Sequence, residues 1–464
     1  MSTPRISCHP TEFHRQLFAL SHESGDLEFY GLPADAANRT LLVASARARL
    51  LTDLCRDSVS DKVLRSVTTV NVARDLEEMR QAIGEGGLRY WGFSYGTTLG
   101  ATYAAMFPAN VQRMVLDGVV YTPEQYNSSL EHGISSGVST RKVFDGFISS
   151  CIEAGSQRCA LKNDTLVDAP GLTHRIANLI ERLQSYPLPV TDLGPASVPV
   201  ILRPADFRLA IFATLLRPIA WAGLAAAIAD LERGDGRRIG ALSGRVWDLR
   251  NLTDAEQAEG AGWGAGRAMG ANEAGMAVSC GDAPTFPAPM DAAWISMWLD
   301  WRERLITNDE FSGPIWFKKM VRCRHWGLIE PPPERYEGQW KLGDDLQPPK
   351  NPILFVSNTY DPVSPISSGR RMVDLFGRDN ARLLENNAYR HCSVSQPSAC
   401  IGSAIREYMI NGVLPAEGTV CQPEQRNPFP PADGHGVQQR DESMFRALEH
   451  LSKAGMGAIE FNQL

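Results

Sequence analysis

The chain has 464 residues, of which 43% are hydrophobic and 21% charged, so it can bury a large core and is not a disordered polymer. At about 150 residues per domain the length suggests roughly three units, although large α/β enzymes with an insertion are also this long. Lys and Arg total 46 against 53 Asp and Glu, a net charge of −7, and no basic block occurs. Because phosphate binding needs clustered cations, we expect no nucleic-acid partner.

The first residues and the most apolar region bear on targeting. The chain opens with polar sequence after Met1 rather than with a basic stretch and an apolar run, so it predicts no export signal as written. The apolar region 209–231 is interrupted by Arg217-Pro218 into two pieces, each shorter than the ~20 residues of a membrane-spanning helix. We therefore expect buried helices there and no membrane partner.

The cysteines and sequons give a different indication of compartment. None of the nine cysteines forms a Cys-x-x-Cys pair or has a His at zinc-finger spacing, so we expect no metal site. Asn-x-Ser/Thr patterns favour an oxidising, secretory location and a glycoprotein; they begin at Asn38, Asn127, Asn163 and Asn251. The sequons therefore favour secretion, whereas the missing signal favours the cytoplasm, and the two indications disagree.

Apolar spacing predicts a helix, a strand and a second helix in the first 120 residues. Residues 71–83 have helical periodicity, 88–93 are short and aromatic-rich, and an Ala-rich helical stretch after residue 96 ends near 107. The first helix presents one apolar face, formed by Val72, Leu76, Met79 and Ile83. A strand at 111–120 follows, and this order is typical of a parallel α/β sheet.

After residue 121 the pattern becomes mainly helical, and strands return only after 349. The Gly/Ala-rich stretch 260–275 predicts a loop; no strand precedes it, so we do not expect a phosphate cradle there. The other predicted elements are helices within 204–233 and 293–305, a strand at 353–357, a helix at 367–376, a strand at 381–384, and a helix at 398–410. Residues beyond 427 predict a loose tail with one late helix.

Residues 92–96, Gly-Phe-Ser-Tyr-Gly, match the nucleophile elbow Gly-x-Ser-x-Gly. The tight turn between strand and helix leaves no room for Cβ atoms on either side of the serine, and it lifts the hydroxyl clear of the sheet. The predicted strand before and helix after Ser94 supply that context, so Ser94 is the candidate nucleophile. The alternative is a serine in a structural turn.

In this fold class the acid follows the nucleophile in the chain and precedes the histidine. Asp361 comes just after the strand at 353–357, where a loop at the strand's end would present it at the active edge. Asp117, which follows the strand after the elbow, is the rival acid, although its Leu-Asp-Gly setting is more typical of a turn. We expect Asp361 to orient the base.

Three histidines follow Asp361: His391, His435 and His450. His391 lies in a loop between the last strand and the last helix, where the base belongs, whereas the other two lie in the tail. The N–H of Tyr95, the residue after the nucleophile, offers one oxyanion donor. The second donor should come from a glycine-rich loop upstream of the elbow, and the chain as given has no such loop.

Several motifs together resemble the tripeptidyl-aminopeptidase-like (TAP-like) α/β-hydrolases, serine exopeptidase relatives with a helical cap and a distinctive C-terminal segment. The motifs are Trp-Gly-Phe-Ser-Tyr-Gly-Thr-Thr-Leu-Gly (91–100), Arg-Met-Val-Leu-Asp-Gly (113–118), Val-Ser-Cys-Gly-Asp-Ala-Pro (278–284), Phe-Val-Ser-Asn-Thr-Tyr-Asp-Pro-Val-Ser-Pro (355–365) and His-Cys-Ser-Val-Ser-Gln-Pro-Ser-Ala-Cys (391–400). The likeness extends from about residue 4 to 428.

The resemblance implies the same triad, Ser94, Asp361 and His391, and a largely secreted or periplasmic location. It also implies four disulfides, Cys8–Cys55, Cys151–Cys159, Cys280–Cys323 and Cys400–Cys421. Cys392, directly beside the base, is then left unpaired.

The chain departs from the family in two places. Before the base the family usually has glycine, whereas this chain has Arg390, a bulky cation in a close turn. The family segment that resembles residues 2–8 follows several strands and the oxyanion loop, so we expect an N-terminally incomplete hydrolase. The strand at 88–93 would then be an exposed apolar edge, which favours aggregation.

We therefore expect an α/β-hydrolase fold in which residues 1–120 form the first part of the core, 121–349 a helical cap, 350–428 the TAP-like part of the core and 429–464 a tail. The predicted reaction is acyl transfer to water through a Ser94 acyl-enzyme, and it needs no cofactor. The resemblance implies a peptide substrate that is trimmed from its free N-terminus. Hydrolysis of a small ester, lactone or thioester is the first alternative. An inactive pseudoenzyme without the oxyanion loop is the second. The sequence makes no prediction about oligomeric state.

Overall fold

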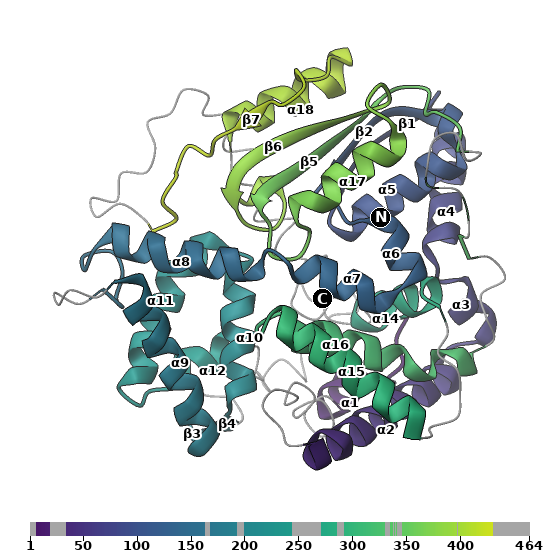
Figure 1. The fold of residues 1–464 in the computed structure, drawn as a ribbon. Coiled ribbons are helices and arrows are strands. Elements are labelled where there is room, and N and C mark those ends of the chain that lie inside the picture. Colours follow the sequence, from purple (N-terminus) through teal and green to yellow (C-terminus); the bar gives the residue numbers. More distant parts are fainter. Residues whose placement is uncertain are drawn as a thin grey trace.

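A five-stranded parallel sheet organises the protein in the computed structural model (Figure 1). The structure describes residues 6–18, 34–162, 168–192, 199–243, 271–284, 292–329, 335–336, 338, 340, 346–396 and 398–429. The sheet order is β1-β2-β5-β6-β7, and every neighbouring pair is parallel. The strands are β1 (Leu88–Phe93), β2 (Val111–Asp117), β5 (Ile353–Tyr360), β6 (Ala381–Tyr389) and β7 (Val420–Cys421). The predicted parallel α/β architecture is therefore confirmed.

Helices cover both faces of the sheet because consecutive side chains of its central strands point to opposite faces. On β2, Met114 and Leu116 join one apolar cluster, whereas Val115 joins another. The first cluster is completed from α4 (Thr69–Ala82), α5 (Tyr95–Met106) and α17 (Ile366–Phe376), and the second from α18 (Ala399–Asn411). The carboxyl ends of the strands are thereby held in a rigid layer that positions the loops following them.

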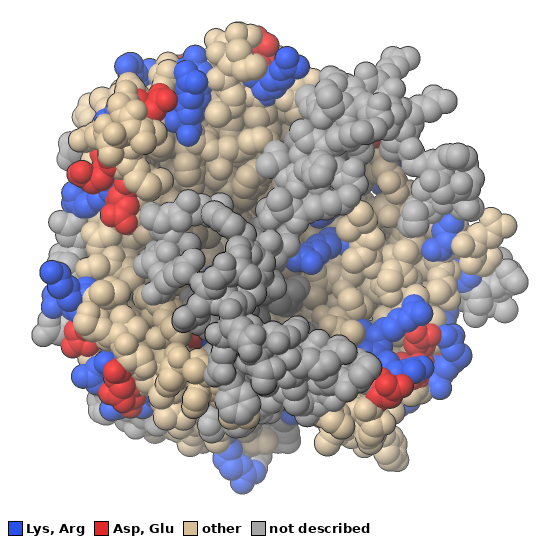
Figure 2. All heavy atoms as spheres, turned by 180° about the vertical axis from the view of Figure 1, so that it is seen from behind, with Lys and Arg blue, Asp and Glu red and all other residues tan. Residues whose placement is uncertain are grey.

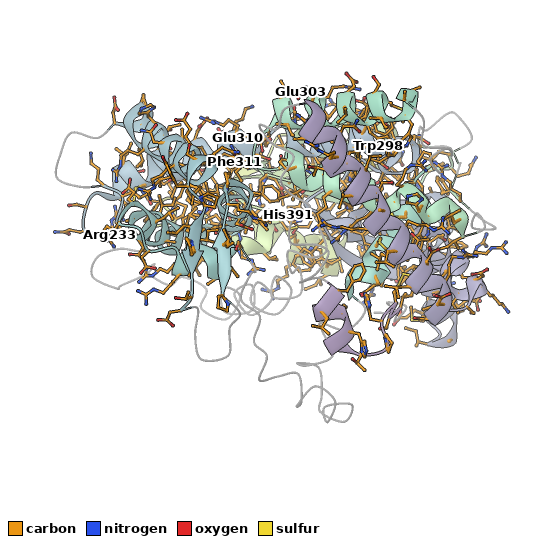
Figure 3. The ribbon with its side chains drawn as sticks, turned by 90° about the horizontal axis from the view of Figure 1, so that it is seen from below. Arg233, Trp298, Glu303, Glu310, Phe311 and His391 are labelled. Atoms are coloured by element: carbon orange, nitrogen blue, oxygen red, sulfur yellow. A yellow bond between two sulfur atoms is a disulfide. The ribbon has the colours of Figure 1, made fainter. Side chains whose placement is uncertain are left out.

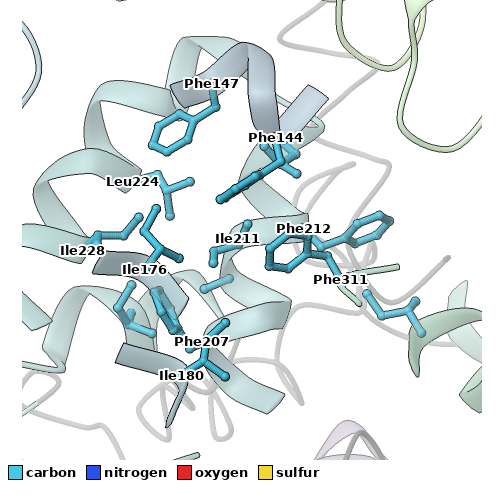
Figure 4. Packing of buried hydrophobic residues seen from close by; sticks show 14 of the residues in the cluster. Phe144, Phe147, Ile176, Ile180, Phe207, Ile211, Phe212, Leu224, Ile228 and Phe311 are labelled. Carbon is cyan, nitrogen blue, oxygen red and sulfur yellow. The ribbon is translucent and has the colours of Figure 1, made fainter. Parts of the chain in front are cut away.

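Between β2 and β5 the described chain is almost entirely helical, as predicted for 121–349. Its helices are α6 (Thr122–Asn127), α7 (Ser129–Gly137), α8 (Thr140–Ala154), α9 (Ala169–Ser185), α10 (Pro204–Leu215), α11 (Trp221–Glu232), α12 (Arg237–Leu242), α14 (Ala271–Asp282), α15 (Ala292–Asn308) and α16 (Gly313–Arg322), with a small hairpin of β3 (Leu188–Val190) and β4 (Val200–Leu202). Figure 4 shows part of its core, where Phe144, Phe147, Phe207 and Phe212 pack with aliphatic side chains.

Helices that precede the sheet pack against this helical region. The helices are α1 (Glu12–Phe18), α2 (Ala34–Ser58) and α3 (Asp61–Ser66), and a 3-10 helix spans Cys323–Leu328. Leu51 and Leu64 share one buried cluster with Met276 of α14 and Trp326. The sequence divided the chain at 120/121, 349/350 and 428/429, and these boundaries stay predictions.

The structure corrects several details of the sequence interpretation. The predicted helix at 71–83 is α4, but its apolar face was only partly right: Leu76 packs against the core, whereas Met79 and Ile83 are exposed. Val70, Ala73 and Glu77 are among the buried residues of this helix. The last five residues of the predicted loop at 260–275 belong to α14, and the rest lie outside the described residues. β2 ends at 117 and β6 continues to 389, so the first strand was predicted too long and the second too short. The predicted tail from 430 onward also lies outside the described residues.

All four disulfides implied by the resemblance are present: Cys8–Cys55, Cys151–Cys159, Cys280–Cys323 and Cys400–Cys421. Cys392 is free and buried. These bonds are compatible with an extracellular protein. In the described part of the chain no helix is long and apolar enough to cross a membrane. On the face in Figure 2, acidic and basic side chains are interspersed rather than gathered by sign.

Candidate active site

Ser94 sits in a strained turn between β1 and α5. Its backbone has φ 54° and ψ −122°, a region that costs a residue with a Cβ on the order of 1–3 kcal/mol. The turn is tight as the motif predicts, because a Cβ on Gly92 would collide with the carbonyl of Gly96 and the ring of Tyr90. The Tyr90 hydroxyl also donates to the Gly96 carbonyl at 2.7 Å. The predicted elbow is therefore formed, with Ser94 at its tip.

Asp361 and His391 are brought together by the ends of two adjacent strands. Asp361 follows β5 and His391 follows β6 by two residues, and both side chains are almost wholly buried. Nδ1 of His391 lies 3.1 and 3.0 Å from the two carboxylate oxygens of Asp361. Such a carboxylate fixes the ring's orientation and favours a proton on Nδ1, so that Nε2 is left as the basic nitrogen.

Nε2 of His391 is buried and has no hydrogen-bond partner within the described part of the protein. A buried polar atom without a partner is rare and calls for an explanation such as a catalytic role. Figure 3 shows His391 near the middle of the view from below, with Arg233 to one side and Trp298 to the other.

The loop carrying His391 is clamped from β5. Nδ2 of Asn358 donates to the carbonyls of Arg390 and Cys392, at 2.7 and 2.9 Å, one on each side of the histidine. Asn386 on β6 in turn donates to Oδ1 of Asn358 at 3.0 Å. Between these anchors Arg390 and Cys392 take φ values of 149° and 61°. The turn thus keeps a conformation that favours glycine at the position where the family usually has glycine and this chain has Arg390.

The rival acid, Asp117, is also buried beside this loop, but its carboxylate binds elsewhere. It accepts hydrogen bonds from the N–H and hydroxyl of Ser393, at 2.8 and 2.5 Å. Burial raises the pKa of Asp117 to about 6. Among the described residues, the carboxylate hydrogen-bonded to the ring of His391 is that of Asp361. The geometry therefore favours Asp361 as the orienting acid.

The elbow and the base loop meet at the backbone of Asp117. Its carbonyl accepts from the N–H of Ser94 at 2.9 Å and from Sγ of Cys392 at 3.5 Å. Burial raises the pKa of the Cys392 thiol well above its usual value, which keeps it a neutral packing group at neutral pH. The two loops thus share one acceptor, and Phe93 beside Ser94 packs against the cluster that contains Cys392. Within the described residues, Ser94 and Nε2 of His391 are not hydrogen-bonded.

Tyr95 is the first residue of α5, where backbone N–H groups have no partner inside the helix and the helix dipole favours negative charge. This placement suits the predicted oxyanion donor. Its side chain continues into a buried network, in which Thr69 links the Tyr95 hydroxyl to the carboxylate of Asp282. Burial raises the pKa of Asp282 to about 6.

Three side chains of this site were not singled out from the sequence. The hydroxyl of Ser364 lies between the acid and the base, 2.8 Å from Oδ2 of Asp361 and 3.1 Å from Nδ1 of His391. The sequence signal that could have identified Ser364 is its position three residues after Asp361, a spacing at which short polar side chains cap a turn. Thr69 and Asp282 lie 213 residues apart in the chain, and no local pattern connects them.

The other candidates from the sequence stand as follows. His435 and His450 lie outside the described residues. No cluster of three or more His, Cys, Asp or Glu side chains able to hold a metal occurs in the described part. Of the four sequons, those at Asn163 and Asn251 fall outside the described residues, and glycosylation stays a prediction.

Comparisons with known proteins agree with this architecture. Residues 21–144 match the family model described as alpha/beta hydrolase fold, and residues 309–421 match the model described as TAP-like protein. The second match contains the two strands and loops that carry Asp361 and His391.

Similar curated proteins include hydrolases with different printed names. The chain is 27% identical to "Serine protease Hip1" of Mycobacterium tuberculosis over 382 residues, which cover 79% of this chain and 64% of that protein. It is 29% identical to "Carboxylesterase B" of the same organism, over 81% of this chain and 64% of the relative. It is 24% identical to "Tripeptidyl aminopeptidase" of Streptomyces lividans, over 78% of this chain and 60% of the relative.

The chain thus spans somewhat less than two thirds of the length of the curated relatives that it matches. Both family models and all three relatives nevertheless indicate the same fold class as the sheet, the elbow and the disulfides of the structure. The chain therefore has the α/β-hydrolase fold and is similar to TAP-like proteins over residues 309–421.

Proposed function

We propose that this protein is a serine hydrolase that works through an acyl-enzyme on Ser94, with His391 as the base and Asp361 as the group that orients it. The observation that carries the proposal is the buried Nε2 of His391, which has no partner among the described residues while Nδ1 is held by Asp361, in a loop that packs against Phe93 beside Ser94. That arrangement supplies a base for a hydroxyl that is otherwise a poor nucleophile.

In the proposed reaction Ser94 Oγ attacks the acyl carbon of the substrate while His391 Nε2 takes its proton. The negative charge on the acyl oxygen is stabilised by the N–H of Tyr95 at the start of α5. His391 then gives the proton to the leaving group, and water hydrolyses the ester on Ser94 with His391 acting as base again. The residues supply each proton transfer themselves, and the reaction uses no cofactor.

We propose a peptide substrate from which residues or short peptides are released at the N-terminus. The relatives named as serine protease and tripeptidyl aminopeptidase support this substrate class. The second candidate is a small ester, lactone or thioester, and it is favoured by the relative named carboxylesterase, which has the highest identity of the three. One triad serves both reactions, because each is acyl transfer to water.

A fluorophosphonate probe tests the proposal, because it labels a serine only when that serine is activated. We expect the folded full chain to be labelled and Ser94→Ala to lose all labelling. Ser66→Ala is the control, since Ser66 is exposed at the end of α3, and this variant should be labelled like the unchanged protein. No labelling of folded protein would instead indicate the inactive pseudoenzyme.

The same variants then separate the substrate classes. Tripeptidyl- and aminoacyl-anilides should be hydrolysed in a Ser94-dependent manner if the protein is a peptidase. Hydrolysis confined to short acyl esters would overturn the peptide proposal and leave the hydrolase proposal standing.

A further inference from the structure

A chain of hydrogen bonds joins the residue after the nucleophile to a carboxylate of the helical region. The Tyr95 hydroxyl lies 2.5 Å from Oγ1 of Thr69, which donates to Oδ2 of Asp282 at 2.6 Å. The backbone N–H of Thr69 donates to the other oxygen of Asp282 at 2.9 Å. Thr69 and Asp282 are buried, whereas Tyr95 keeps 37% of its surface exposed. The chain therefore runs from the candidate site into the interior.

The direction of these bonds is fixed by the chemistry of the groups. An ionised carboxylate only accepts, so the single hydroxyl proton of Thr69 goes to Asp282, and Tyr95 must donate to Thr69. Thr69 is also the first residue of α4, where the helix dipole stabilises a negative charge. Asp282 thus ends a polarised series of donors that begins at Tyr95.

Asp282 is held at this place by the geometry of α14. A Cβ on its neighbour Gly281 would lie 3.3 Å from both the Thr68 side chain and the Val67 carbonyl, so the missing side chain lets α14 approach the start of α4. One residue earlier, the disulfide Cys280–Cys323 ties the end of α14 to the 3-10 helix Cys323–Leu328. The carboxylate is therefore presented to Thr69 by a backbone with little freedom.

The hydrogen bond made by the Tyr95 side chain adds to the bonds that hold the rest of the elbow. The N–H of Ser94 is bonded to the sheet through Asp117, and the hydroxyl of Thr97 donates to the Ser94 carbonyl at 2.7 Å. In the proposed reaction the N–H of Tyr95 stabilises the oxyanion. An oxyanion donor works only when its hydrogen is aimed at the developing charge. Anchoring the ring of Tyr95 limits rotation of the peptide that carries this N–H.

We infer that Asp282 is a positioning residue, which acts through Thr69 to hold Tyr95 in the orientation needed for oxyanion stabilisation. This inference rests on the proposed function. It assigns to the helical region a part in the chemical step, in addition to any part in substrate selection.

Steady-state hydrolysis of p-nitrophenyl acetate by the full chain tests the inference. We expect Asp282→Asn and Tyr95→Phe each to lower kcat about 10- to 100-fold and to leave KM within about twofold, because the loss falls on the transition state. Thr69→Val should match them, whereas Thr69→Ser keeps both donors and should retain kcat. The double variant Asp282→Asn/Tyr95→Phe should be no worse than the poorer single variant, since both changes break one chain.

Asp309→Asn is the matched control. Asp309 is also a buried carboxylate that accepts from a hydroxyl and from backbone N–H groups, those of Ser312 and Phe311, but it lies in the turn between α15 and α16. Its variant should lose stability with an unchanged kcat. Full kcat in both Asp282→Asn and Tyr95→Phe would overturn the inference, as would an equal loss in Asp309→Asn. Absence of Ser94-dependent hydrolysis in the unchanged protein would instead overturn the proposed function, and the inference with it.

Discussion

The acid–base side of the candidate site is built in the middle of the sheet, whereas the nucleophile side is built at its edge. Asp361 follows β5 and His391 follows β6, and each of these strands has a strand neighbour on both sides. β1, which leads to Ser94, pairs only with β2 among the strands that the structure describes. The two halves of one site are therefore held by different means.

On the acid–base side, several hydrogen bonds from nearby side chains fix the loop of His391 and the carboxylate of Asp361. Asn358, Asn386 and Ser364 bind the base loop and the acid through short polar side chains, and Cys400–Cys421 ties α18 to β7 nearby. On the elbow side, besides the bond from the Ser94 N–H to Asp117, α4 anchors α5 through Glu77 and the elbow itself through Thr69. The contrast teaches that the orientation of His391 is set by the core, while that of the nucleophile turn depends on side chains reaching in from flanking helices.

The largest expected effect concerns the acid. Asp361→Asn should lower kcat about 10⁴-fold, because an amide no longer holds the productive tautomer of His391. The measurement is kcat on a short acyl ester, with circular dichroism to verify folding. Asp117→Asn is the matched control, since Asp117 is equally buried at the end of the adjacent strand, and we expect it to lower kcat at most about tenfold. A reversed order would make Asp117 the orienting acid.

A smaller effect is expected on the elbow side, at the buried carboxylate of Glu77. It accepts from Arg80, Gln81 and, at 2.6 Å, from the Tyr103 hydroxyl of α5. The hydrogen bond from Arg80 is the main cause that lowers its pKa from 4.5 to about 2. We expect Glu77→Gln to cost about 2 kcal/mol of unfolding free energy at pH 7, since hydrogen bonds to a charge are replaced by neutral ones.

The lowered pKa of Glu77 also predicts how the effect of Glu77→Gln changes with pH. A carboxylate whose pKa is lower in the folded chain stabilises the fold above the unfolded value and loses that contribution as the pH falls. The difference between the unchanged protein and Glu77→Gln should therefore shrink as the pH falls from about 4.5 towards 2. Urea unfolding at a series of pH values measures it. Glu78→Gln, at the exposed neighbour, should stay within about 0.5 kcal/mol at every pH, and an equal loss there would contradict the prediction.

The same contrast explains what the sequence could predict. Ser94 is recognisable because its turn has strict steric demands within five residues, and Asp361 and His391 follow short, strongly apolar strands whose order the fold class sets. The disulfides were implied only by resemblance, because connectivity does not follow from spacing.

Other features depend on tertiary contacts that no local pattern carries. The apolar periodicity of 71–83 placed Met79 and Ile83 inside, yet the structure buries Glu77, because Arg80 and Tyr103 satisfy its charge. Apolar periodicity cannot register a buried carboxylate that is satisfied by Arg80 on the same helix and by Tyr103 on α5. Asp282 escaped notice for the same reason, since its partner Thr69 is distant in the chain. Buried carboxylates satisfied by hydrogen bonds are thus what sequence analysis missed on the elbow side.

The smallest effect, and one of opposite sign, is expected at Arg390. The N–H of Arg390 donates to Tyr360 at 2.8 Å and its carbonyl accepts from Asn358, so both of its peptide groups are tied to β5 and its φ of 149° cannot relax. Arg390 is also buried, and this burial, together with nearby Arg217, lowers the pKa of its guanidinium to about 9.

Arg390→Gly should therefore raise the unfolding free energy by about 1 kcal/mol, the relief of backbone strain exceeding the entropy cost of glycine. Thermal and urea unfolding measure the change. Arg390→Ala separates the two causes, because it removes the cation but keeps the Cβ that disfavours this φ. If Arg390→Ala stabilises as much as Arg390→Gly, desolvation of the charge dominates. If only Arg390→Gly stabilises, backbone strain dominates. The hydrogen bonds that position His391 then hold Arg390 in an unfavourable conformation.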